Sequence, residues 1–240
     1  MQKITTLTTF SLICLTIWIA AVTSALSKTE SVSASQIQQA RSKGQINLAD
    51  TLAADLMAKA QISGDTQILA TALYESARNS MERNKYDEAQ VLLNESIEAF
   101  QTINDSSGLG QAYRQLGMVH RYKVDYPLAL EYLYMAMQVF QQNQDLQAMS
   151  SIHSSLGVVL EKMGQYEQAL QSHQQSLELN RELNDESGIA SDLYNLGDIR
   201  REMGDNEAAL TYFNDALALD LASGDVKNIA YSHHKLGYTK

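Results

Sequence analysis

Five histidines are the side chains in this sequence best able to bind a metal ion: His120, His153, His173, His233 and His234. His233 and His234 are adjacent, so about 100° would separate them on a helix. His153 and His233 hold equivalent positions in helices that we expect to lie far apart compared with a metal–ligand distance of about 2 Å. His173 falls among apolar positions, which favours a partly buried side chain over a ligand. The sequence therefore predicts no metal site.

Two short motifs contain the residue types of catalytic or phosphate-binding sites. Ser232 and Lys235 formally match a Ser-x-x-Lys motif, and Gly108 with Gly110 forms half of a glycine-rich phosphate loop. Neither motif has its partner motifs, and neither follows a predicted strand, as these chemistries require. The carboxylates are scattered over predicted helix exteriors, where solvation explains them. We expect no catalytic residues, no cofactor and no enzyme activity.

The elements that would position any site repeat along the chain. Leu116–Gly117 recurs every 40 residues, as Leu156–Gly157, Leu196–Gly197 and Leu236–Gly237. Three more columns keep this register: Ala89, Ala129, Ala169 and Ala209; Tyr86, Tyr126 and Tyr166; and Asp65, Asp105, Asp145, Asp185 and Asp225. A fixed period of this length indicates stacked helical or strand units rather than one closed globule.

Each period contains two amphipathic helices. The first carries apolar residues at i, i+4, i+7 and i+11, namely Ile152, Leu156, Val159 and Met163, and Gly164 ends it. The second presents Tyr166, Ala169, Leu170, His173 and Leu177 on one face, and Asp185 is placed to cap the next helix. Glycine inside the first helix costs roughly 1 kcal/mol against alanine. We therefore expect the second helix to approach closely over Gly117, Gly157 and Gly197.

The combination of Leu156–Gly157, Gly164, Tyr166 and Ala169–Leu170 resembles the tetratricopeptide repeat, in the variety with a 40-residue period found in scaffolds and bacterial sensors. The resemblance covers about residues 31–240. Departures are Asn206 for tyrosine, Val124 for glycine, and Ser76–Ala77 for Leu–Gly. It implies an all-α, right-handed superhelical solenoid of antiparallel helix pairs, which we predict as eleven helices from about residue 31 with no strands.

Residues 1–25 have the pattern of a signal peptide. Lys3 is the only charge, an apolar core runs from Phe10 to Val22, and Thr23, Ser24 and Ala25 are small residues suited to cleavage. The core is short for a membrane span of about 20 residues, although an uncleaved anchor stays open as the alternative. We expect export, to the periplasm of a Gram-negative bacterium. Removing this segment removes Cys14, the one cysteine.

The remaining chain, residues 28–240, is predicted to form one domain. Repeats would start near residues 28, 66, 106, 146 and 186, and a single helix would occupy 226–240. Because Leu236–Gly237 keeps the signature that normally receives a second helix, we expect the chain to be a truncated or split form of a longer membrane signalling protein. The alternative is that residues 226–240 form a lone helix that caps the last apolar face. A net charge of −10 without a basic run argues against nucleic acid and anionic lipid surfaces as partners.

In the resembling family the first helix of each pair lines a concave face that binds a peptide. Register places three columns of this sequence there: Tyr74, Arg114, Ser154, Tyr194 and His234; Glu75, Gln115, Ser155, Asn195 and Lys235; and Met81, Arg121, Glu161 and Arg201. The candidate peptide-binding residues are Asn195, Arg201, Tyr194, Arg121, Arg114, Gln115 and Tyr74. The resemblance implies that Asn195, in the segment Tyr194–Gly197, holds peptide backbone amides. The alternative is that all seven are ordinary polar surface residues.

Two functions remain from this sequence. The first is an exported, non-catalytic interaction module that binds a protein or peptide in its groove. The second is the sensory input region of a membrane signalling protein such as a histidine kinase or diguanylate cyclase, which the resemblance to periplasmic repeat regions implies. A downstream hydrophobic span would distinguish them. The sequence does not identify the bound partner or the oligomeric state.

Overall fold

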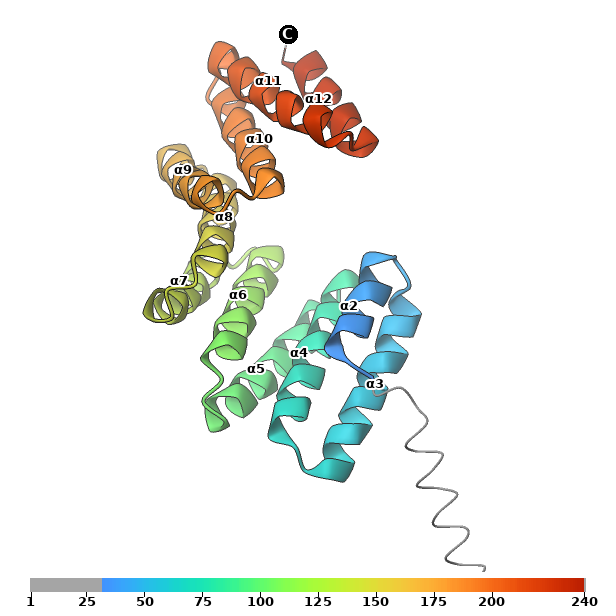
Figure 1. The fold of residues 1–240 in the computed structure, drawn as a ribbon. Helices are drawn as coiled ribbons and strands as arrows, with labels where there is room; N and C mark the ends of the chain where they lie inside the picture. Colours follow the sequence, from blue (N-terminus) through green and yellow to red (C-terminus); the bar gives the residue numbers. More distant parts are fainter. Residues whose placement is uncertain (1–31, 240) are drawn as a thin grey trace, which may run out of the picture.

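The computed structural model describes residues 32–239, which form helices joined by short turns (Figure 1). The predicted signal peptide at residues 1–25 lies outside the described residues. The helices are α2 (Ala34–Ser42), α3 (Ile46–Ser63), α4 (Thr66–Glu82), α5 (Tyr86–Thr102), α6 (Ser106–Tyr122), α7 (Tyr126–Gln142), α8 (Leu146–Lys162), α9 (Tyr166–Glu182), α10 (Glu186–Glu202), α11 (Asn206–Ser223) and α12 (Val226–Tyr238). The prediction of eleven helices without a strand is confirmed for this part of the chain.

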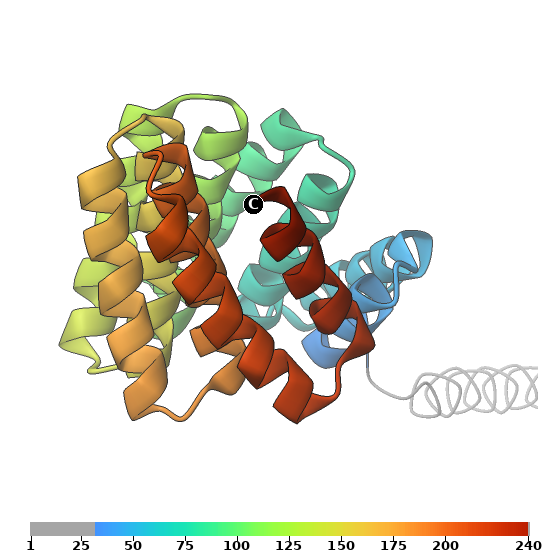
Figure 2. The same ribbon diagram turned by 90° about the horizontal axis from the view of Figure 1, so that it is seen from above.

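The helices pack in consecutive pairs that form a solenoid. Each helix contacts the next one in the sequence, and the backbones of alternate helices approach one another in the series α2, α4, α6, α8 and α10. These helices therefore form the inner layer of the curved array, and α3, α5, α7, α9 and α11 form the outer layer. Figure 1 shows the pairs following a curve from α2 at one end to α12 at the other, and Figure 2 shows the same pairs winding round when the array is seen from above.

The glycines inside the inner helices mark the places where the two layers come closest, as the sequence predicts. A Cβ atom at Gly117 would lie 2.9 Å from Cγ of Leu133 and 3.0 Å from the carbonyl oxygen of Ala129, both on α7. At Gly197 it would lie 2.5 Å from the ring of Phe213 on α11. Contacts this short leave no room for a side chain, so the packing of each pair offsets the low helix propensity of its glycine.

The turns between helices use a left-handed residue followed by a cap. Asn84, Asn104 and Asn184 have φ between 54° and 57°, and an aspartate follows two of them. Asp185, for example, caps α10 by accepting a hydrogen bond from the backbone N–H of Gly188. Val124 takes the same conformation with φ of 63°. A β-branched residue is strained there, by about 1–2 kcal/mol relative to an ordinary helical conformation.

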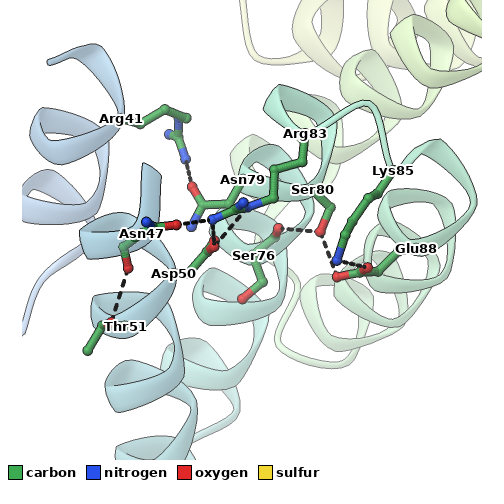
Figure 3. Close-up of polar contacts among 10 residues, drawn as sticks. All are labelled: Arg41, Asn47, Asp50, Thr51, Ser76, Asn79, Ser80, Arg83, Lys85 and Glu88. Carbon is green, nitrogen blue, oxygen red and sulfur yellow. Dashed lines mark hydrogen bonds and ion pairs between the residues drawn. The ribbon is translucent and has the colours of Figure 1, made fainter. Parts of the chain in front are cut away.

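Polar side chains, as well as apolar ones, hold the first two pairs together (Figure 3). Arg83, just after α4, donates to Asp50 and Asn47 on α3. Arg41 on α2 donates to Asn79 on α4, and it also pairs with Glu75 at 2.6 Å. Arg41 and Glu75 are almost fully enclosed, with 6% and 1% of their side chains exposed. An ion pair buried this deeply makes the contact between α2 and α4 dependent on both charges.

No helix between residues 32 and 239 is both long enough and apolar enough to cross a bilayer. The same residues contain no cluster of three or more histidine, cysteine or acidic side chains arranged to hold a metal ion.

Candidate functional site

The inner layer carries a hollow of about 280 Å³ between α6, α8 and α10. We call it the serine hollow, because Ser150, Ser151, Ser154 and Ser155 of α8 line it together with Ser191 of α10 and Ser176 of α9. Arg114 and Met118 of α6 form one wall, and Gln147, Asp185 and Asp192 contribute to the opposite side. Most of the lining residues are polar, and the hollow is open to solvent and large enough for a side chain of a ligand.

A buried polar network lies beneath the serine hollow. Ser150 donates to the Asn180 side-chain carbonyl, and the Asn180 amide donates to Asp192 Oδ2 at 2.8 Å. His173, which is fully buried, places Nδ1 3.5 Å from Asp192 Oδ1. His173 was expected to be partly buried and is more enclosed than that, because α8 at Gly157 covers its ring. The network fixes α8, α9 and α10 relative to one another, so the hollow is preformed.

Arg114 is the cation in the lining of the hollow, and no carboxylate of the described residues lies within ion-pairing distance of it. Its Nε atom is buried without a hydrogen-bond partner among the described residues. Burial lowers the pKa of the Arg114 guanidinium, Tyr74 opposes this effect, and the neighbouring charge of Arg78 adds to it. The guanidinium remains charged at neutral pH, since its ordinary value is 12.5. The hollow therefore has a positive wall in a chain whose net charge is −10.

Three of the other predicted groove residues lie near Arg114 or on the same helix. Gln115 donates to the Tyr74 hydroxyl across α4 and α6, at 3.5 Å. Arg121 lies about two helical turns further along α6. Its guanidinium carbon is 4.0 Å from the Tyr122 ring centroid, and its Nε is buried without a hydrogen-bond partner among the described residues. The structure thus groups Tyr74, Arg114, Gln115 and Arg121 on the inner surface of α4 and α6.

Asn195 and Arg201 lie apart from that group, on α10. Both are half-buried. Arg201 is partly engaged by its own helix, with its guanidinium 2.9 Å from Glu202 and 3.8 Å from Asp198. Asp198 in turn pairs with Lys235 of α12, so the surface of α10 near Arg201 is a mixed-charge surface rather than a basic one.

Tyr194 differs from the expectation that it is exposed in the groove. Only 8% of the residue is exposed, and its hydroxyl is hydrogen-bonded to Asp220 of α11 and Ser232 of α12. Burial and the bond to Asp220 raise the pKa of the Tyr194 hydroxyl to about 12. The reason is that α12 closes over this end of α10, whereas the equivalent residues Tyr74 and Arg114 remain half-buried. Tyr194 therefore joins α10, α11 and α12 in place of facing a ligand.

Sequence reasoning did not anticipate the serine hollow as a unit. Ser154 and Ser155 appeared in the predicted inner columns, and the run Ser150–Ser155 was the available signal. Asn180 and Asp192 gave little signal, because the preceding repeats hold apolar residues in their columns: Phe100 and Phe140 for Asn180, and Ala112 and Ile152 for Asp192.

Comparison with known proteins agrees with this architecture. Residues 148–222, from α8 to α11, match the tetratricopeptide repeat family. No curated protein sequence matches the chain significantly.

Three solved structures illustrate the likeness of the whole array. BtubC (BKLC) from P. vanneervenii has a TM-score of 0.68 at 18% identity, covering 79% of this chain and 78% of its own. A Rap protein complexed with competence and sporulation factor has a TM-score of 0.60 at 15% identity, covering 81% and 59%. A signal transduction ATPase with a tetratricopeptide repeat sensor from Pyrococcus horikoshii has a TM-score of 0.67 at 21% identity, covering 90% of this chain and 35% of its own. At these identities the likeness establishes the fold, a solenoid of tetratricopeptide-like helix pairs.

Proposed function

We propose that this protein is a non-catalytic interaction module whose inner layer binds a peptide or an extended segment of a protein partner. The observation that carries the proposal is the serine hollow with Arg114 at its wall. It is a polar, preformed recess on the inner side of a solenoid, and it holds a charge without a partner. The Rap structure complexed with competence and sporulation factor is a relative in fold with a bound partner. Nucleic acid is a poor candidate for the partner of a chain with a net charge of −10.

The test begins with a selection of peptides that bind the protein from a displayed random library. We expect selected peptides to lose affinity for Arg201→Ala and Asn195→Ala, because both residues are half-buried polar groups of the inner layer. A hydrogen bond to a charged group contributes roughly 1.5–3 kcal/mol, so the dissociation constant for Arg201→Ala should rise at least about tenfold. Isothermal titration calorimetry measures the dissociation constants of both variants.

Arg181→Ala is the matched control, since Arg181 is exposed on the outer helix α9. The Arg181→Ala protein should bind the peptides with the same affinity as the unmodified protein. If Asn195→Ala and Arg201→Ala also leave the affinity unchanged, the peptides bind elsewhere than around α10, and the role of these two residues is disproved.

The alternative function is a sensory input region. One relative in fold, a signal transduction ATPase, has a tetratricopeptide repeat sensor, and the match with this chain covers 35% of that protein's length. In this case the groove ligand would be a signal passed to another domain rather than a scaffolded partner.

Export is a separate part of the proposal, supported by the composition of residues 1–25 alone. A fusion of residues 1–31 to alkaline phosphatase, which is active only after export, should show activity in a Gram-negative host. Absence of activity with a stable fusion would contradict export, and retention of the fusion in the membrane fraction would favour the uncleaved anchor.

A further inference from the structure

The positive wall of the serine hollow indicates the chemistry of the group that enters it. Most basic side chains near the inner layer are already neutralised by carboxylates: Arg41 by Glu75, Lys235 by Asp198, and Arg201 in part by Glu202. Arg114 is the exception among the groups that line the hollow. A half-buried charge without a counter-ion is less favourable than a paired one, and an anion supplied from outside would stabilise it.

The carboxylates inside the hollow do not supply that anion. Asp192 is 1% exposed, and its oxygens face the Asn180 amide and His173. Asp185 caps α10 through Oδ1 and accepts a hydrogen bond from Gln147 through Oδ2. Neither is within ion-pairing distance of Arg114; the neighbours that influence its charge are Tyr74 and a second cation, Arg78.

The hollow also offers a hydroxyl donor on α8, the inner helix adjacent to the one that carries Arg114. Ser154 is the equivalent of Arg114 one repeat later, on the adjacent inner helix α8, and it is half-buried. The Ser151 hydroxyl donates to the backbone carbonyl of Gln147, and the Ser155 hydroxyl donates to the backbone carbonyl of Ser151, both on α8. In the described part of the chain no such bond engages the Ser154 hydroxyl, which leaves it able to donate to a ligand.

We propose that the serine hollow binds the carboxylate of an aspartate or glutamate side chain in a peptide lying along the inner layer, with Arg114 as its ion-pair partner and Ser154 as a hydroxyl donor. A guanidinium suits a carboxylate because two parallel N–H groups match its two oxygens. The volume of about 280 Å³ accommodates one such side chain. This inference rests on the proposed function and specifies the class of peptide that the groove selects.

The experiment uses two displayed peptide libraries, both blocked at the C terminus. The acidic library contains Asp and Glu, and the second library has Asn and Gln in their place but is otherwise identical. The full-length protein should enrich binders from the acidic library and few from the other. For an enriched peptide, replacing its critical Glu by Gln should weaken binding at least about tenfold to the unmodified protein. The same replacement should change binding to Arg114→Gln less than twofold, because the charge partner is then already missing.

Arg181→Gln is the charge-matched control, since it removes one exposed arginine from outer helix α9 and should retain the full acidic preference. A second variant, Ser154→Glu, places a carboxylate beside Arg114 and should block acidic peptides without unfolding the chain. If Arg114→Gln does not fold, binding of acidic peptides to Ser154→Glu tests the proposal by itself. Melting temperatures of both variants, which we expect to equal or exceed that of the unmodified protein, distinguish loss of a ligand contact from loss of structure.

The outcomes separate this inference from the proposed function. If no peptide of either library binds, the interaction module itself is in error. If peptides bind with equal preference, or if the acidic preference persists unchanged in Arg114→Gln and Ser154→Glu, the carboxylate site is disproved and the module stands.

Discussion

Gly157→Leu is expected to unfold the pair α8 and α9. A Cβ atom at Gly157 would lie 2.4 Å from Nε2 and 2.5 Å from Cδ2 of His173. His173 is fully buried and held between α8 and Asp192, so its ring has no space into which it can move. Overpacking a core by a few methylenes costs about 1–3 kcal/mol, and more where neighbours cannot yield. We expect a loss of at least about 3 kcal/mol, measured as the free energy of unfolding by urea titration monitored by circular dichroism.

The chain provides a control in the same column. Gly237 is the equivalent glycine of α12, and a Cβ atom there meets nothing within 4 Å. Gly237→Leu should therefore be tolerated, and it should gain up to about 1 kcal/mol from the better helix propensity of leucine. Similar losses of stability for the two variants would show that close approach of the outer helix is not what requires glycine.

Glu75→Ala is expected to detach the first helix from the array. Glu75 accepts hydrogen bonds from Arg41 at 2.6 Å and from Gln38 at 2.8 Å, both on α2, and is 1% exposed. Truncating it leaves Arg41 buried without its carboxylate partner. Breaking a buried pair in this way costs about 3–5 kcal/mol. Because α2 is short, with nine residues, we expect the loss to appear as proteolysis before α3 and a lower unfolding temperature.

Glu88→Ala serves as the comparison for an exposed pair. Glu88 binds Lys85 at 3.0 Å, and about half of each side chain is exposed (Figure 3). Pairs of this kind contribute about 0–1 kcal/mol. Glu75→Gln keeps an acceptor for Arg41, so its loss of stability should lie between those of Glu75→Ala and Glu88→Ala. An equal cost for Glu75→Ala and Glu88→Ala would contradict the role assigned to the buried pair.

The helix pairs could be predicted from the sequence because their causes are local. Apolar residues at helical spacing, a capping aspartate and a left-handed turn residue all lie within one period, as around Asp185. The close approach at Gly157 could also be predicted, because an unfavourable residue retained in a helix requires a packing reason. These features do not depend on contacts far away in the chain.

The surface properties of the inner layer depended on distant partners and could not be predicted. Tyr194 is buried because α11 and α12 cover it, and its hydroxyl is hydrogen-bonded to Asp220 and Ser232, which lie 26 and 38 residues later in the sequence. Register did assign Arg114 to the inner surface, but it could not show that no carboxylate lies near its guanidinium. Register assigns a residue to a column, but the neighbouring helices decide whether that position is exposed, paired or enclosed.

The contact pattern of the array has a mechanical consequence. In residues 32–239 no helix touches another that lies more than two helices away in the sequence, so nothing ties α2 to α12. The curvature is the sum of small rotations between successive pairs, each set by its own interface. Small rotations at successive interfaces therefore add up to a large displacement of the two ends of the array. A partner that spans several helices can adjust the width of the groove by distributing the strain over many interfaces, without breaking any one of them.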